Sequence, residues 1–172
     1  MLNKFITQFT LNSSLSKGHA KMKPQAKLRE NYPFIFPIQT RWSDNDIYGH
    51  VNNVNYYSFF DSAANALLIQ KAHFDIHHSP IIGLVVSSSC QFLQELCYPE
   101  VIEVGVAINR MGNSSLEYDL AIFKANQSTA AAQGQFIHVF VDREQRKSTP
   151  IPMNMRQALQ AFMHVEPDQK FV

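Results

Sequence analysis

The fold is decided by the stretch Arg41-Trp42-Ser43-Asp44-Asn45-Asp46-Ile47-Tyr48-Gly49-His50-Val51-Asn52-Asn53-Val54-Asn55-Tyr56-Tyr57. It packs two carboxylates, a histidine, a glycine and several asparagines into one short segment. Asp, Asn and Gly are residues that turns favour, so we expect residues 44–52 to form a loop. No other segment concentrates so many polar and reactive side chains, which makes this loop the first candidate for a functional site.

The segments on either side of this loop have different periodicities. Residues 34–43 alternate β-branched and aromatic side chains, which predicts a strand, and Pro37 predicts a sheet edge or a strand start. Residues 53–74 repeat apolar side chains at helical spacing, which predicts a helix. Asn52 or Asn53 can cap this helix, because asparagine accepts hydrogen bonds from free backbone N–H groups. Since the helix is apolar on most sides, we expect the rest of the chain to wrap around it.

After Pro80 the pattern changes to strands separated by turn residues. The four expected strands are Gly83–Leu93, Val101–Met111, Ser115–Lys124 and Ala130–Asp142, and a final helix is expected over Met153–Val165. Short connections between strands favour antiparallel order over units in which a helix crosses between strands. The sequence therefore predicts an α+β fold in which an antiparallel five-stranded sheet is wrapped around one long helix.

Composition fits one globular domain of 172 residues, with 45% hydrophobic and 17% charged residues. A net charge of +1 argues against a dedicated nucleic-acid binder. No apolar run approaches the roughly 20 residues of a membrane span. Two cysteines, Cys90 and Cys97, make neither a disulfide framework nor a zinc pattern, so we expect buried, reduced thiols and a cytoplasmic location.

Residues 1–29 hold six lysines and arginines and no acidic residue. We interpret them as an N-terminal extension, flexible or loosely docked, or as the result of a translation start that truly lies at Met22. A third reading is a transit peptide, which would give an organellar location. Residues 30–172 are then expected to form the single domain.

The same loop contains part of a metal-binding pattern. Asp44, Asp46 and Gly49 imitate the start of a calcium-binding loop, but Asn55 stands where a bidentate glutamate is needed. No glycine-rich phosphate loop or dinucleotide motif occurs. We therefore expect no metal and no cofactor.

The motif Asp44-x-Asp46-x-x-Gly49-His50-Val51-Asn52-Asn53-x-x-Tyr56, between a strand and a long helix, resembles that of the hotdog-fold acyl-CoA thioesterases. In particular, it is similar to the 4-hydroxybenzoyl-CoA thioesterase-like family. The resemblance covers about residues 34–152. It implies a hotdog fold, hydrolysis of an acyl-CoA with Asp46 as the catalytic carboxylate, and a thioester carbonyl held at the helix N-terminus near Asn53. It also implies a homodimer or homotetramer with its sites at subunit interfaces.

Physical chemistry agrees with these roles. Thioester cleavage develops negative charge on the carbonyl oxygen, and free N–H groups at a helix start stabilise such a charge. Gly49 permits a tight turn and a close backbone approach. Asp46 is then either the nucleophile or the general base for water, and the sequence leaves both roles open.

The remaining candidates are weaker. We interpret His50 as supporting the site, Asp44 as a turn or cap residue, Tyr56 as lining the substrate groove and Asp61 as lying behind it. Arg143, Arg146 and Lys147 follow the last strand and are candidates for the CoA phosphates.

Two other functions are alternatives to the thioesterase. The first is a hotdog-fold enoyl-CoA hydratase or dehydratase, and the second is a non-catalytic acyl-binding domain. Dehydratase sites of this fold place a histidine five positions after the aspartate, whereas Asp46 and His50 are four apart. The acyl group, and whether CoA or acyl carrier protein bears it, stay open in the sequence.

Overall fold

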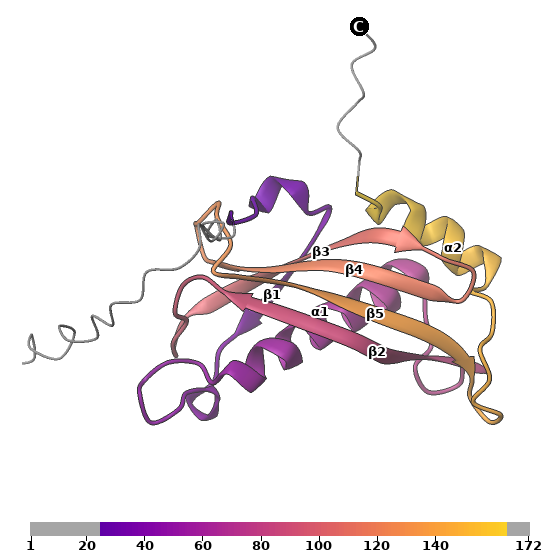
Figure 1. The fold of residues 1–172 in the computed structure, drawn as a ribbon, viewed down its shortest axis with the longest axis horizontal. Coiled ribbons are helices and arrows are strands. Elements are labelled where there is room, and N and C mark those ends of the chain that lie inside the picture. The colour runs from indigo at the N-terminus through magenta and orange to yellow at the C-terminus, as the bar shows by residue number, and fades with distance from the viewer. Residues whose placement is uncertain (1–24, 165–172) are drawn as a thin grey trace, which may run out of the picture.

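The computed structural model describes residues 25–164, so most of the predicted extension over 1–29 lies outside the described residues. A five-stranded sheet and one long helix form its centre (Figure 1). The strands are β1 (Phe34–Gln39), β2 (Ile81–Phe92), β3 (Val101–Met111), β4 (Ser115–Lys124) and β5 (Ala132–Asp142). The helices are α1 (Asn53–Ala72) and α2 (Met153–Leu159), with short 3-10 turns at Arg29–Asn31, Trp42–Asp44 and Gln160–Phe162.

The sheet order is β1-β3-β4-β5-β2, and every neighbouring pair is antiparallel. β1 and β2 are therefore the two edges. Pro37 lies in edge strand β1, which confirms the prediction, because an edge strand tolerates a residue without a backbone N–H. The predicted α+β hotdog fold, with an antiparallel sheet around one helix, is confirmed.

Helix α1 lies along one face of the sheet (Figure 1). Its residues Phe60, Ala63, Ala64 and Leu67 have no exposed surface, since they pack into the core that the sheet completes. Gly134 in β5 allows this close approach: a Cβ atom there would lie 2.9 Å from the Phe60 ring and 2.1 Å from the Ser89 carbonyl oxygen. Packing against the sheet fixes the direction of α1 and hence the position of its N-terminus.

The outer face of the sheet carries a polar cluster centred on Asp119 of β4. This carboxylate is 5% exposed and is contacted by Lys27 Nζ, by the Tyr32 hydroxyl at 3.0 Å and by His164 Nε2 at 2.9 Å. It thereby holds both ends of the described chain against the sheet.

Several predicted boundaries differ from the structure. The strand expected over 34–43 ends at Gln39, and the 3-10 turn Trp42–Asp44 follows. The final helix ends at Leu159 rather than Val165, because Met163 pairs with Ile108 of β3 and the His164 N–H donates to the Ile108 carbonyl. Cys90 and Cys97 are free cysteines. Both are only half-buried, so the prediction that they are buried was wrong. Partial burial raises the pKa of the Cys90 thiol to about 11.

Candidate active site

The loop between β1 and α1 folds back on itself. The Asp46 N–H donates to the His50 carbonyl at 2.8 Å, and the Gly49 N–H donates to the Asp46 carbonyl at 3.2 Å. Gly49 has φ of +89°, a conformation that side-chain-bearing residues rarely adopt. The glycine of the motif is thus required by the turn that presents Asp46.

Asp44 is the buried aspartate of this loop, with a side chain 1% exposed. Its carboxylate accepts hydrogen bonds from the Arg41 backbone N–H at 2.7 Å and from Arg41 Nη2 at 2.7 Å. Burial acts to raise the pKa of Asp44, but the bonds from Arg41 outweigh it and the pKa is lowered. Its backbone carbonyl accepts from the Asn52 N–H and from Asn55 Nδ2, both at 2.8 Å. Asp44 therefore organises the loop and the helix start, in the role expected for it.

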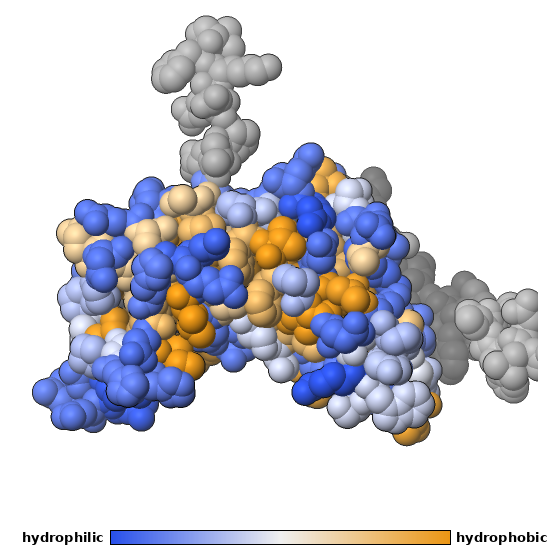
Figure 2. Space-filling view, turned by 180° about the vertical axis from the view of Figure 1, so that it is seen from behind, coloured by the Kyte–Doolittle hydropathy of each residue, from blue (hydrophilic) through white to orange (hydrophobic). Residues whose placement is uncertain are grey.

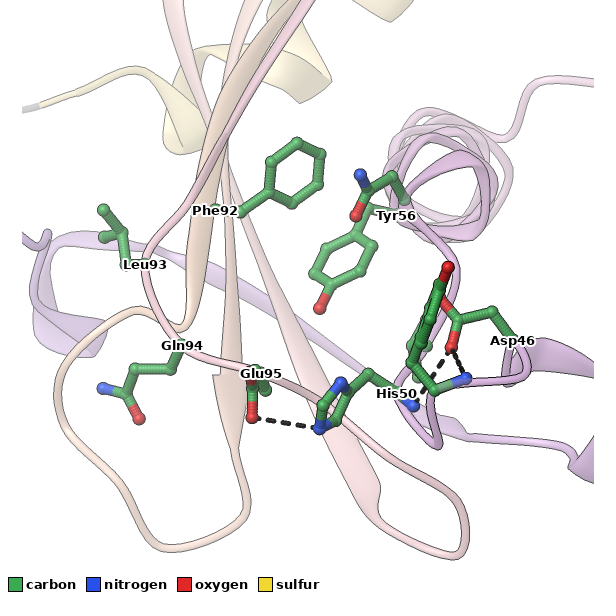
Figure 3. Close-up of a pocket in the computed structure, with 10 residues that line it drawn as sticks. Asp46, His50, Tyr56, Phe92, Leu93, Gln94 and Glu95 are labelled. Carbon is green, nitrogen blue, oxygen red and sulfur yellow. Dashed lines mark hydrogen bonds and ion pairs between the residues drawn. The ribbon is translucent and has the colours of Figure 1, made fainter. Parts of the chain in front are cut away.

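Asp46 has a different environment. Its Oδ1 accepts from the Tyr48 N–H at 2.8 Å, and the His50 N–H lies 3.5 Å from the same oxygen. Within residues 25–164 no group donates a hydrogen bond to the other oxygen, Oδ2. Asp46 lines a cavity of about 600 Å³, shown in Figure 3. The loop thus anchors one carboxylate oxygen and leaves the second available for chemistry.

The N-terminus of α1 opens into the same cavity. The Val54 N–H donates to Asn52 Oδ1 at 3.2 Å and the Asn55 N–H donates to the Asn52 carbonyl at 2.9 Å. The Asn53 N–H has no acceptor in the described part of the chain, and Asn53 lines the cavity. A free backbone donor at a helix start is suited to a developing negative charge.

The rest of the cavity wall comes from Tyr48, His50, Val51, Tyr56 and the end of β2 with the loop that follows it. Tyr56 is 3% exposed, its ring packs edge-to-face on Phe92 at 5.0 Å, and burial raises the pKa of its hydroxyl to about 12. Glu95 contacts His50, with Oε2 and Nε2 3.0 Å apart (Figure 3). Sequence reasoning identified Asp46, Gly49, His50, Asn53 and Tyr56, all of which the structure brings to this loop or cavity, and missed Glu95.

Other predicted site residues lie elsewhere. Asp61 is two helical turns further along α1, exposed, and accepts from Asn65 Nδ2 at 3.2 Å. Arg143 holds the connection before β2, donating to the Ser79 carbonyl at 2.7 Å and to the Ile76 carbonyl at 2.8 Å. Arg146 and Lys147 are exposed in the same turn. This turn adjoins the start of β2, whereas the cavity adjoins its end, roughly 35 Å away at 3.3 Å per residue.

Neither a metal cluster nor a membrane-crossing helix occurs among residues 25–164. No three metal-ligating side chains gather there. The helices within residues 25–164 are too short or too polar to span a bilayer.

Comparison with known proteins gives three kinds of match. The family model described as the thioesterase-like superfamily matches residues 40–159, which is more than half of the chain. The chain is 24% identical over 93 residues to the uncharacterised protein YsmA of Bacillus subtilis, a match that spans 54% of this chain and 63% of YsmA, less than two thirds of that relative.

Solved structures agree with the family match. The PA5185 protein of Pseudomonas aeruginosa is 50% identical, with a TM-score of 0.79 over 81% of this chain and 97% of that one. Slr0204 of Synechocystis, named as a 1,4-dihydroxy-2-naphthoyl-CoA thioesterase, is 20% identical, with a TM-score of 0.67 over 73% of this chain and 94% of its own. At that identity the second likeness shows the fold alone.

Proposed function

We propose that the chain, which belongs to the thioesterase-like superfamily, is a thioester hydrolase of the acyl-CoA thioesterase class in which Asp46 and the N-terminus of α1 carry out the hydrolysis. One observation carries the proposal. Asp46, whose Oδ2 accepts no hydrogen bond among residues 25–164, and Asn53, whose backbone N–H has no acceptor among them, line the same cavity. The thioester carbonyl oxygen accepts from the Asn53 N–H, which polarises the carbonyl carbon for attack.

Asp46 serves in this proposal as the nucleophile or as the base for water. Its anchored oxygen, Oδ1, fixes the direction of the side chain, and Oδ2 makes the reactive contact. Gly49 shapes the turn, and Tyr56 with Phe92 forms the apolar wall against which an acyl group packs. CoA is the proposed carrier, in line with the naphthoyl-CoA named for Slr0204.

Replacement of Asp46 by Asn tests the assignment. Asparagine keeps an oxygen that can accept from the Tyr48 N–H, so the loop is expected to keep its shape. We expect kcat/KM for a panel of acyl-CoAs, measured by thiol release, to fall about 10²–10⁴-fold. Asp46→Asn with near wild-type turnover would refute the role of Asp46. Hydration of crotonyl-CoA without thiol release would instead favour the hydratase alternative.

We also propose that the protein works as a homodimer, or a homotetramer built from such dimers. β2 is a sheet edge of twelve residues whose outer backbone groups are unpaired among the described residues. It exposes Leu84, Val85, Val86 and Phe92, and α1 beside it exposes Val54 and Ile69. Figure 2, seen from the side of α1, shows apolar patches on this face. Exposed edges of this kind are usually covered.

A two-fold pairing of β2 with β2 of a second copy also concerns the CoA phosphates. Antiparallel pairing brings the start of one β2 toward the end of the other. Arg143, Arg146 and Lys147 of one copy, which lie beyond the start of β2, then approach the cavity of the other copy and become available to the phosphates of CoA. Light scattering at micromolar concentration is expected to give at least twice the chain mass, and Val86→Lys is expected to lower it. A monomeric wild-type protein would contradict the pairing.

A further inference from the structure

Glu95 has no role in the motif, yet it makes a specific contact in the cavity. His50 Nε2 lies 3.0 Å from Glu95 Oε2, and both residues line the cavity with Asp46 and Asn53. The two side chains are 44% and 76% exposed. Exposed ion pairs stabilise folded proteins by only about 0–1 kcal/mol, so folding stability gives little reason for this pair.

The backbone holds these two residues together more firmly than their exposure suggests. Val51, next to His50, donates its N–H to the carbonyl of Leu96, next to Glu95, at 2.7 Å. Val51 is 3% exposed and Leu96 is fully buried. A second link runs from the Tyr98 N–H to Asn45 Oδ1 at 3.1 Å. The loop before α1 and the loop after β2 are therefore joined beneath the pair, and the pairing of Glu95 with His50 is built into the fold.

This contact also selects between the two ring nitrogens of His50. A carboxylate at Nε2 favours the proton on that nitrogen, which leaves Nδ1 with a free lone pair. Nδ1 of His50 has no hydrogen-bond partner in the part of the chain that the structure describes. In Figure 3 the ring stands between Asp46 and Glu95, with Nε2 turned toward Glu95.

We propose that His50 is the base for the hydrolytic water and that Glu95 is its positioning residue; this rests on the proposed thioesterase function with Asp46 as nucleophile. Asp46 Oδ2 attacks the thioester carbon, the C–S bond breaks, and a mixed anhydride and a CoA thiolate result. His50 Nδ1 then takes a proton from water as the water oxygen bonds to the acyl carbon. The bond from that carbon to Asp46 breaks, which regenerates the carboxylate and releases the acid. The imidazolium returns its proton to the thiolate, so the balance is one water consumed and one acid and one thiol formed.

Rapid-mixing measurement of thiol release tests the proposal on the full-length protein. In His50→Gln we expect a burst of about one thiol per active site followed by slow turnover, because anhydride formation continues while its hydrolysis is slowed. General-base catalysis contributes about 10²–10⁴-fold, so the steady rate is expected to fall within that range. Glu95→Gln is expected to show the same burst with a smaller loss, about 10-fold or more, and little change in KM.

The double variant separates positioning from an independent effect. Because Glu95 acts through His50, adding Glu95→Gln to His50→Gln is expected to cause almost no further loss. Glu30→Gln, an exposed glutamate on the 3-10 turn before β1, is the matched control and is expected to behave as wild type.

Three outcomes would overturn the inference: a wild-type rate in Glu95→Gln, multiplicative losses in the double variant, or slowed turnover without a burst in His50→Gln. These outcomes are distinguishable from failure of the proposed function. If Asp46→Asn abolishes turnover while Glu95→Gln does not change it, only the role of Glu95 fails. If Asp46→Asn retains turnover, the function of the Asp46 loop fails instead.

Discussion

Asp44 and Asp46 are the same residue type two positions apart in one loop, and their environments are opposite. Asp44 is 1% exposed, and both of its carboxylate oxygens accept from Arg41. Asp46 lines an open cavity, and only its Oδ1 accepts a hydrogen bond within the described residues. The difference shows that a carboxylate becomes structural when its acceptor capacity is filled and remains available for chemistry when part of it is left free.

The two residues also depend on one another. The Asp44 carbonyl receives the Asn52 N–H and Asn55 Nδ2, which sets the start of α1. That start carries the Asn53 N–H, which has no acceptor among residues 25–164, and Asn53 lines the same cavity as Asp46. Asp44 therefore helps to build the helix start at the cavity that Asp46, the proposed catalytic aspartate, also lines.

Asp44→Asn is expected to have the largest effect on stability, and it tests the difference between the two aspartates. An amide NH₂ group would face the Arg41 donors and leave buried groups unpaired, at a cost of about 1–3 kcal/mol of unfolding free energy. Asp46→Asn, on a half-buried side chain, is expected to change that free energy by no more than about 0.5 kcal/mol. Urea unfolding of both variants measures the difference, and equal stability losses would contradict the division of roles.

Asp44→Asn also tests the role of Asp44 in acid, by comparison with wild type. The hydrogen bonds from Arg41 lower the pKa of Asp44 in the folded state despite its burial. The unfolded chain therefore binds more protons at this position, so stability decreases as the pH falls below the ordinary aspartate value of about 3.9. Urea midpoints measured from neutral to acid pH are expected to fall less steeply for Asp44→Asn than for wild type. An identical slope would show that Asp44 does not contribute to acid unfolding.

Gly49→Ala is expected to have the next largest effect and to act on the Asp46 side of the loop alone. No atom lies within 4 Å of a Cβ placed at Gly49, so the cost comes from the backbone at φ of +89° and amounts to about 1–2 kcal/mol. The Gly49 N–H donates to the Asp46 carbonyl, so a strained Gly49 is expected to disturb Asp46. The rate of thiol release is therefore expected to decrease together with the free energy of unfolding. Gly49→Asn is the matched control, since asparagine tolerates positive φ better. Equal losses in the two variants would contradict backbone strain as the cause.

The sequence was sufficient for the fold because periodicity is local. Alternation over residues 34–43 and helical spacing over 53–74 each depend on neighbours in the chain, and they predict β1 and α1. The end of the last helix was predicted too late because Met163 and His164 pair with Ile108, more than fifty residues away. A tertiary contact of this kind leaves no periodic signal.

The same limit applies to the site. Asp46, Gly49 and Asn53 belong to one continuous motif, so their proximity follows from the sequence. Glu95 reaches His50 only because the Val51 N–H bonds to the Leu96 carbonyl, a contact between segments 45 residues apart. The one available signal was that Glu95 follows the expected end of a strand, and this does not say which loop it will meet.

The contrast between filled and free polar groups recurs inside the sheet. Tyr118 and Asp119 are consecutive in β4 and point to opposite faces. Asp119 is contacted by three side chains, whereas the Tyr118 hydroxyl is fully buried beside His138 and has no hydrogen-bond partner among the described residues. Burial raises the pKa of Tyr118 and lowers that of His138, which favours the uncharged form of both side chains.

Tyr118→Phe is expected to have the smallest effect of the series. Removing a buried hydroxyl that lacks a partner deletes no hydrogen bond and keeps the ring contact with His138, whose centroid lies 5.0 Å away. The unfolding free energy is therefore expected to stay within about 1 kcal/mol of wild type, or to rise. Asp119→Asn, one residue away, is the matched comparison and is expected to cost more, because it disturbs contacts to Lys27, Tyr32 and His164. A larger loss of unfolding free energy in Tyr118→Phe than in Asp119→Asn would show that the Tyr118 hydroxyl has a hydrogen-bond partner in solution. Contacts within one chain would then not distinguish polar groups that have a partner from those that lack one.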